Sequence, residues 1–457
     1  MYYFLRLVVR IALRIFFRKY KVYQRHLLAT PTPLLIVANH PNTFMDPLII
    51  ASLLRQKVYF LANGSIFKGR LLKWLWRQFN MIPIYRIEDT KEGIDQATQN
   101  KKAFEQCFLA LKKGATILIF PEGVSEIDRK LRKIKTGTAR IALGAAHEYD
   151  FTLGLQILPI GLNYEAPQRF RSDVWVNVGE PIDLSEWRHY QPSDFALVRE
   201  LTATIDDTLR QLVVDTTDEK EDQLVRQVTT LYKNEFFRET KKASEEKEEA
   251  FRLIKHIIAA IRLYREDYTT KYEQIRLKLS SYFTQLTQHK IPDHLLRDTQ
   301  TVQQLFWRSL TILVGLTVSF PLYLYGLFNN YLPYILPSRI ANLITREEAY
   351  RAPIMLVSGI FSFSIFYSLQ ISLFARWVLT VHFIIAYALS LPISGFFVLY
   401  YWRYLEQLQV YMRLWRVASQ SFPLLNNWLQ QRQALLLLLQ EAENRYWQKI
   451  ENSQPEG

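Results

Sequence analysis

A histidine and an aspartate lie six residues apart in the stretch ANHPNTFMDP, residues 38–47. An apolar run, residues 34–37, precedes them, and Pro41 disfavours the α region for His40, so we expect the histidine at the end of a strand. Asp46, followed by a second proline, suits the N-cap or first turn of the next helix. Across such a turn, Asp46 can accept a hydrogen bond from His40 Nδ1–H, which leaves Nε2 free as a general base toward a hydroxyl.

A second motif, IFPEGVSE at residues 119–126, also follows an apolar run. Pro121 and Gly123 indicate a tight turn with Glu122 at its tip. Turn amides beside the basic stretch RKLRKIKTG, residues 129–137, would suit a phosphate group. Taken alone, this motif has an ordinary structural explanation, and so does a His–Asp pair at a strand end.

The elements that must position these motifs follow from the pattern between residues 26 and 185. Apolar, strand-like runs occupy residues 34–38, 58–62, 81–85, 116–120, 155–164 and 174–178. Helical stretches occupy residues 47–54, 66–79, 94–113 and 138–147. Strands rich in Val and Ile that alternate with helices predict an α/β domain, a sheet flanked by helices. Ligands of such domains bind in the loops at the carboxyl ends of the strands, where both motifs fall.

The rest of the chain differs in composition. Residues 186–305 carry mixed charges at helical spacing and predict long solvent-facing helices without visible chemistry. Residues 306–403 contain three uncharged stretches, each long enough to span a bilayer, between Arg308 and Arg339, Arg351 and Arg376, and Arg376 and Arg403. Residues 404–457 return to an amphipathic helical pattern.

The first 25 residues predict an amphipathic helix that docks on a membrane. Arg6, Arg10, Arg14 and Arg18 recur every four residues and would form one stripe toward anionic headgroups, above apolar side chains that enter the acyl boundary. The alternative is a basic face on an ordinary surface helix.

The overall composition agrees with an anionic partner. The net charge is +14, and aromatic residues make up 14% of the chain. This combination suits a membrane interface, and it would also suit single-stranded nucleic acid. The lone cysteine, Cys107, excludes an internal disulfide, and no Cys/His cluster has the spacing of a metal site.

The order of the motifs resembles one known family. A His–Asp pair follows the first strand, Arg86 follows the third, F-P-E-G follows the fourth, and the apolar-proline strand ILPIG comes afterwards. This combination resembles the phospholipid/glycerol acyltransferases, which include glycerol-3-phosphate and 1-acylglycerol-3-phosphate acyltransferases. The resemblance covers about residues 30–185.

The resemblance implies an O-acyltransferase that moves a fatty acyl group from a thioester to a glycerol hydroxyl without an acyl-enzyme. It implies that His40 is the general base and that Asp46 orients it. It also implies that Arg86, Glu122 and Gly123 bind the glycerol-phosphate acceptor, and that the acyl site lies near Pro159. No cofactor is expected, because acyl-CoA or acyl carrier protein is a co-substrate.

Two departures place the chain closer to one subgroup. Five residues separate His40 from Asp46, where the common motif has four, and Val124 and Ser125 stand where the common motif continues with Thr and Arg. Both resemble the fungal and bacterial glycerol-3-phosphate/dihydroxyacetone-phosphate acyltransferases, which also carry extra membrane segments. Because this arginine is missing, another cation must bind the phosphate of the acceptor. The candidates are Arg129, Lys130, Arg132 and Lys135.

The expected protein is therefore an integral membrane enzyme of phospholipid biosynthesis that acylates glycerol 3-phosphate. Its expected partners are membrane lipids, the acyl donor and the acceptor, with no nucleic acid. Arg403, Arg413 and Arg416 follow the last span, and cytoplasmic loops favour such charge. The catalytic domain is also expected on the cytoplasmic side, in which case the number of full crossings should be even. Acylation of 1-acylglycerol 3-phosphate, and a non-catalytic membrane-anchored lipid-binding protein, are the alternatives. The oligomeric state, the donor and the acyl-chain length stay open.

Overall fold

The computed structural model describes residues 2–31, 33–64, 80–84, 96–192, 194–236, 246–297, 302–378 and 380–453. The chain forms two compact units. The first contains residues 1–215 and 336–362, and the second contains residues 216–335 and 363–457.

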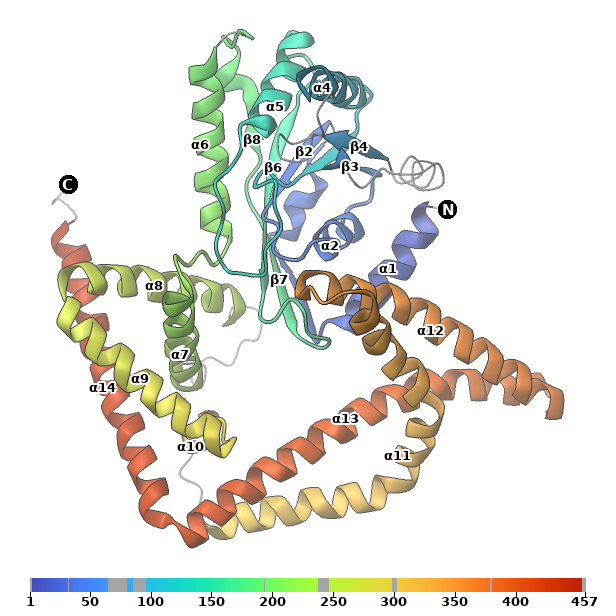
Figure 1. Ribbon diagram of the computed structural model, residues 1–457, viewed down its shortest axis with the longest axis vertical. Coiled ribbons are helices and arrows are strands. Elements are labelled where there is room, and N and C mark those ends of the chain that lie inside the picture. The colour runs from blue at the N-terminus through green and yellow to red at the C-terminus, as the bar shows by residue number, and fades with distance from the viewer. Residues whose placement is uncertain are drawn as a thin grey trace. The chain divides into compact units, whose positions relative to one another are not determined.

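An eight-stranded mixed sheet forms the centre of the first unit, as Figure 1 shows. Its main path runs in the order β1-β7-β6-β2-β5-β3-β4, and β8 pairs with β6. The strands are β1 (Lys19–Tyr23), β2 (Leu34–Ala38), β3 (Val58–Asn63), β4 (Met81–Ile84), β5 (Thr116–Ile119), β6 (Gln156–Tyr164), β7 (Asp173–Val178) and β8 (Ile182–Asp183). β2 is parallel to both neighbours, β5 and β6, so the carboxyl ends of these three central strands lie at one edge.

Alternation along the buried strands divides the core into two layers. Leu35 and Val37 of β2 pack on one face of the sheet, and Leu34 and Ile36 pack on the other. The first face is covered by α4 (Gln96–Lys112), α5 (Gly137–Glu148) and α6 (Phe195–Leu212). The second face is covered by α1 (Tyr2–Phe16), α2 (Met45–Leu53) and the beginning of α12 (Glu348–Trp377).

Three expectations about the borders of the α/β domain need correction. Residues 1–25 are not one helix, because α1 ends at Phe16 and residues 19–23 form a sheet strand that pairs with β7. α6, expected within the charged region 186–305, instead buries Leu201, Ile205 and Leu209 against the sheet. The first turns of α12, expected within the membrane segments 306–403, belong to the first unit.

The arginine stripe of α1 also differs from the expectation. Arg6 donates to the carbonyl of Leu54, and Arg18 pairs with Asp173 at 2.8 Å, so these two guanidinium groups hold the helix to the domain. The exposed side chains of α1 are mostly apolar instead, and they are those of Tyr3, Phe4, Leu7, Ile11 and Ile15, together with Arg14. An apolar face bordered by basic side chains still agrees with docking on a lipid surface.

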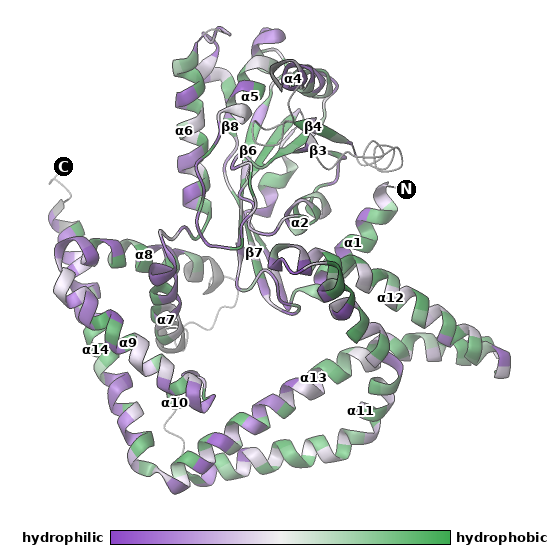
Figure 2. Cartoon of the chain, viewed as in Figure 1, coloured by the Kyte–Doolittle hydropathy of each residue, from purple (hydrophilic) through white to green (hydrophobic). Residues whose placement is uncertain are grey.

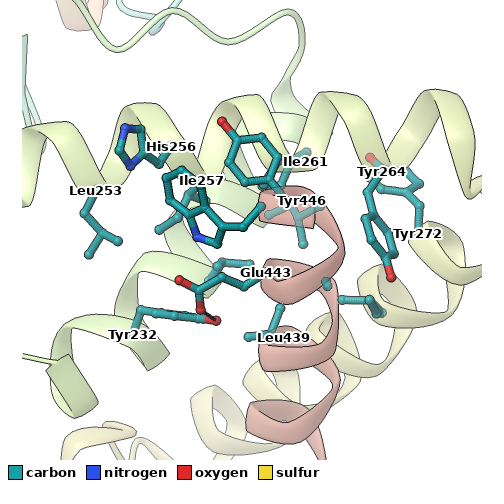
Figure 3. A pocket seen from close by; sticks show the side chains of 16 residues that line it. Tyr232, Leu253, His256, Ile257, Ile261, Tyr264, Tyr272, Leu439, Glu443 and Tyr446 are labelled. Atoms are coloured by element: carbon teal, nitrogen blue, oxygen red, sulfur yellow. Dashed lines mark hydrogen bonds between the residues drawn. The ribbon is translucent and has the colours of Figure 1, made fainter. Parts of the chain in front are cut away.

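The second unit is helical. Apart from the long apolar helices, its described elements are α7 (Glu219–Phe236), α8 (Glu246–Asp267), α9 (Thr269–His289), α10 (His294–Arg297) and α14 (Phe422–Ser453). α7, α8, α9 and α14 surround a largely apolar pocket of about 110 Å³, in which Glu443 accepts a hydrogen bond from Tyr232 at 2.8 Å (Figure 3). Burial, followed by this contact with the carboxylate, raises the pKa of Tyr232 far above its usual range.

Three helices are long and apolar enough to cross a membrane: α11 (Val302–Ile344), α12 and α13 (Val381–Gln420). Figure 2 shows long green, hydrophobic stretches along these helices. Many of their large apolar side chains are exposed, among them Phe328, Phe361 and Ile393, as expected for surfaces that face lipid. These helices agree with the expected membrane protein.

Candidate active site

The two sequence motifs meet at the carboxyl edge of the sheet. β2 ends at Ala38 and its parallel neighbour β5 ends at Ile119, so His40 and Glu122 leave the sheet side by side. The backbone N–H of His40 donates to Glu122 Oε1 at 2.8 Å. The site is therefore assembled by the pairing of two strands that are distant in sequence.

His40 and Asp46 form a hydrogen-bonded pair. His40 Nδ1 lies 2.8 Å from Asp46 Oδ2, and the carboxylate is fully buried in the first turn of α2. Asp46 accepts two further hydrogen bonds, from the backbone N–H of Asn42 at 2.7 Å and from the hydroxyl of Tyr164 at 2.5 Å. A carboxylate held by three partners fixes the orientation of the imidazole and favours the tautomer with the proton on Nδ1.

The imidazole has one face covered and one nitrogen available. Its ring stacks on Phe120 with centroids 3.9 Å apart and an interplanar angle of 10°. The side chain is 18% exposed, and no described residue hydrogen-bonds to Nε2. Nε2 is therefore placed to remove a proton from a hydroxyl that approaches the site.

Tyr164 at the end of β6 and Asn39 just after β2 extend this arrangement, and the sequence argument missed both. Asn39 accepts from Leu162 N at 2.7 Å and donates to Leu162 O at 2.9 Å, so its side chain continues the β2–β6 pairing for one more residue. Burial, followed by the negative charge of Asp46, raises the pKa of Tyr164 well above its usual range, so its hydroxyl stays a donor. The sequence did offer one indication of Tyr164, namely its position at the end of a strand. That strand, β6, runs parallel to β2, so both strands end at the same edge of the sheet.

The carboxylate of Glu122 accepts hydrogen bonds from two backbone amides, and its expected contact with the acceptor stays a prediction. Oε1 accepts from His40 N, and Oε2 accepts from Arg132 N at 2.8 Å. The side chain is only 6% exposed. Burial raises the pKa of Glu122, although the two backbone hydrogen bonds favour its charged form. Glu122 thus ties the end of β2 to the loop after β5.

Gly123 and Lys135 lie together at the F-P-E-G turn. Gly123 has a φ of 71°, and a Cβ atom there would come within 3.0 Å of Lys135 Nζ. The left-handed backbone therefore favours glycine, and a Cβ atom would also crowd the flexible end of the lysine that covers the turn. The backbone N–H of Lys135 donates to Pro121 O at 2.9 Å, which holds the lysine over the turn. Its exposed ammonium is a suitable partner for an anionic group.

Two other cations of this loop already have partners, and a third is exposed. Arg132 pairs with Glu126 and Asp128, and Arg129 donates to the carbonyl of Tyr164 at 3.5 Å. Lys130 is exposed. Arg86 lies outside the described residues, so its expected contact with the acceptor stays a prediction.

Pro159 is buried inside the sheet, in register with Val37. On its other side β6 changes partner, because β8 pairs with Gln156 and Ile157 whereas β7 pairs from Ile160 onward. A proline lacks the N–H that a ladder needs, and it occupies the gap between the two partners. Pro159 therefore has a structural role within the sheet, and its expected position near an acyl site stays a prediction.

Comparison with known proteins shows what part of the chain is similar to. The family model described as Acyltransferase matches residues 19–163. Glycerol-3-phosphate O-acyltransferase 1 of Saccharomyces cerevisiae is 28% identical over 257 residues, which cover 54% of this chain and 32% of that protein. The chloroplastic 1-acyl-sn-glycerol-3-phosphate acyltransferase BAT2 of Brassica napus is 28% identical over 134 residues, which cover 29% of this chain and 34% of that protein.

The chain thus spans about a third of the length of the curated relatives it matches. Among solved structures, the 1-acyl-sn-glycerophosphate acyltransferase PlsC from Thermotoga maritima is similar with a TM-score of 0.33 and 20% sequence identity. That match covers 46% of this chain and 78% of PlsC.

Proposed function

We propose that this chain, whose residues 19–163 form an acyltransferase-family domain, transfers a fatty acyl group from a thioester to glycerol 3-phosphate at a membrane surface. The observation that carries the proposal is the His40–Asp46 pair, with Nδ1 bound to a buried carboxylate and Nε2 available at the surface of the site. The yeast relative is named for acylation of glycerol 3-phosphate, and the plant relative for acylation of 1-acylglycerol 3-phosphate.

The proposed reaction needs one proton relay. His40 Nε2 takes the proton of the acceptor hydroxyl as its oxygen attacks the thioester carbonyl. The tetrahedral intermediate then expels the thiolate, which takes the proton back from the imidazolium as the ester forms. Asp46 stays ionised and stabilises the transient imidazolium at 2.8 Å. No covalent acyl-enzyme is required.

The acceptor phosphate is proposed to bind at the F-P-E-G turn. Lys135 lies over Gly123, and its ammonium supplies a charge that the absent arginine at position 125 would have supplied. Arg86 is the second proposed contact. In this proposal Glu122 holds the backbone of His40 and Arg132 in place, and the cations bind the phosphate.

The membrane location follows from the three spanning helices and the apolar face of α1. Arg403, Arg413 and Arg416 favour the cytoplasmic side for the chain that follows the last apolar stretch. We propose the same side for the catalytic domain, which requires an even number of full crossings among the three apolar helices. A fatty acyl product and a water-soluble phosphate acceptor both have access to a domain at that interface.

The decisive experiment offers the purified full-length protein a panel of substrates. The donors are acyl-CoA and acyl carrier protein loaded with the same acyl chain, and the acceptors are glycerol 3-phosphate, dihydroxyacetone phosphate and 1-acylglycerol 3-phosphate. The highest kcat/KM is expected with glycerol 3-phosphate. A higher kcat/KM with 1-acylglycerol 3-phosphate would show that the protein acylates that acceptor instead. If no acyl group is transferred to any acceptor, the alternative of a non-catalytic, membrane-anchored lipid-binding protein would be favoured.

A further inference from the structure

Thr43, in the loop between His40 and Asp46, has a strained backbone. Its φ is 29°, in a region that β-branched residues rarely adopt. Such a conformation persists only where the surroundings hold it, and strained residues gather at functional sites. The contacts of Thr43 show what holds it.

Two hydrogen bonds, one from the backbone and one from the side chain, hold Thr43. Its backbone N–H donates to Ser125 Oγ at 2.8 Å, and its hydroxyl donates to the carbonyl of Ala349 at 2.6 Å. The preceding residue, Asn42, is fully buried, and its N–H donates to Asp46 Oδ2. The peptide that carries the Thr43 N–H is thus joined to the residue that holds the catalytic carboxylate.

The contact with Ser125 links the two departures from the common motif. The His–Asp loop is one residue longer, and a serine stands where an arginine is common. A guanidinium group has no acceptor, so an arginine at position 125 could not receive the Thr43 N–H through its side chain. The longer loop and the serine therefore form one structural unit.

The contact with Ala349 depends on a proline one turn further along α12. In a regular helix the carbonyl of Ala349 would accept the N–H of residue 353. Residue 353 is Pro353, which has no N–H, so this carbonyl has no helical donor. The hydroxyl of Thr43 takes that place, and the ring of Tyr350 lies 6.2 Å from the ring of Phe44 beside it.

Packing keeps this turn of α12 against the catalytic domain. Ala352 is fully buried and Leu356 is 4% exposed, and both belong to the core layer that contains Leu13, Phe16 and Ile36. Residues 336–362 accordingly fold with the first unit. A segment more than 300 residues away in the chain therefore supplies part of the wall of the His–Asp loop.

We propose that Thr43 is a positioning residue for the His40–Asp46 pair, and that the first turn of α12 completes the active site by accepting its hydroxyl. Without this hydrogen bond the strained loop relaxes and shifts the Asn42 amide away from Asp46. The kinetic consequence rests on the acyl-transfer function proposed above. The structural consequence, a looser loop, does not.

The kinetic test uses full-length protein with the variants Thr43→Val and Thr43→Ser. Valine keeps the β-branched shape and loses the hydroxyl, so we expect kcat to fall about five- to twentyfold with KM values for donor and acceptor within about twofold of the original. Serine keeps the hydroxyl and should restore most of the rate. Thr152→Val is the matched control, because Thr152 donates to the carbonyl of Tyr149 at 2.7 Å away from the site.

Two kinetic results would overturn the proposal. One is a Thr43→Val variant as fast as the original protein. The other is an equal loss of rate in Thr43→Val and Thr43→Ser, because the hydroxyl would then not be the group that matters.

Amide hydrogen exchange gives a readout that needs no activity. Thr43→Val should speed exchange in peptides that cover residues 41–46 and residues 348–352, and Ser125→Ala should speed it in the first peptide. Unchanged exchange in both peptides of a folded Thr43→Val variant would refute the contact. If the original protein transfers no acyl group to any acceptor, the proposed function fails, and the exchange result still decides on the contact.

Discussion

Each of the two units of this protein contains a buried network of polar side chains. The two networks differ in whether one of their polar atoms is left accessible. In the α/β unit, Asp46 receives His40, Tyr164 and the Asn42 amide, and the network ends at an imidazole nitrogen without a described partner. In the helical unit, Asn329 and Asn330 of α11 bind tyrosines from two other helices. The first network leaves a reactive atom accessible, whereas the second is occupied by its own members.

The network of the apolar helices connects all three of them. Tyr367 of α12 donates to Asn330 Oδ1 at 2.5 Å, and Tyr387 of α13 donates to Asn329 Oδ1 at 3.1 Å. Asn330 Nδ2 also donates to the carbonyls of Gly326 and Leu391. Polar side chains that bind each other across apolar helices hold those helices together. Hydrogen bonding of a buried polar group therefore does not by itself indicate chemistry, and the accessible end of the network does.

The largest expected effect comes from removing the accessible end of the first network. His40→Ala should lower kcat by about 10² to 10⁴, because the general base is lost while the buried core is unchanged. Asp46→Asn should also reduce the rate strongly, since an amide cannot accept from all three donors that surround the carboxylate. A folded His40→Ala protein with near-normal turnover would show that both networks are structural.

The next effect tests Tyr164, a buried member of the first network. Tyr164→Phe removes the hydroxyl that donates to Asp46 Oδ1 and should lower kcat roughly tenfold. Tyr20→Phe is the control, because Tyr20 lies beside the same core and its hydroxyl contacts Ser52 at 3.4 Å instead. Equal rates for the two variants would show that Tyr164 does not contribute to the function of the His40–Asp46 pair.

The second network should respond in stability and not in rate. Asn330→Leu removes contacts to two helices, and we expect the unfolding midpoint in detergent to fall by a few degrees, for a loss of roughly 1 kcal/mol. Thr317→Val, which removes an exposed hydroxyl bound to Leu313 O within α11, should leave the midpoint unchanged. A strong loss of kcat in a stable Asn330→Leu protein would give the helical network a catalytic role and remove the contrast.

The smallest effect is the pH dependence that Glu122 contributes to stability. Burial raises the pKa of this carboxyl in the folded protein, so the folded state holds its proton more tightly than the unfolded chain. The contribution of Glu122 to stability is therefore present below its ordinary pKa of about 4.5 and is lost as the pH rises through the raised value. Measured as an unfolding midpoint against pH, the original protein should lose stability relative to Glu122→Gln over this window. A difference that is constant with pH would contradict the sign of the shift.

The sequence determined the motifs and the kind of element that carries each of them. The strands expected at residues 34–38 and 116–120 match β2 and β5 within a residue, because short runs of buried Leu, Ile and Val identify central strands. His40 and Glu122 follow these strands closely, so their meeting at the carboxyl edge could be expected from strand order alone. The three apolar helices were equally visible, since length and the absence of charge decide whether a helix can span a bilayer.

Tertiary structure alone decided which distant residues complete the site. β1, with the sequence KYKVY, has no apolar run, and it is a strand because β7 offers it a free edge. Glu122 faces two backbone amides and Tyr164 faces Asp46, and neither partner is near in sequence. Thr43 meets Ala349 only because Ala352 and Leu356 are buried in the core of the α/β unit. Local periodicity records which face of an element is apolar, but the pairing of those faces depends on the burial achieved by the whole chain.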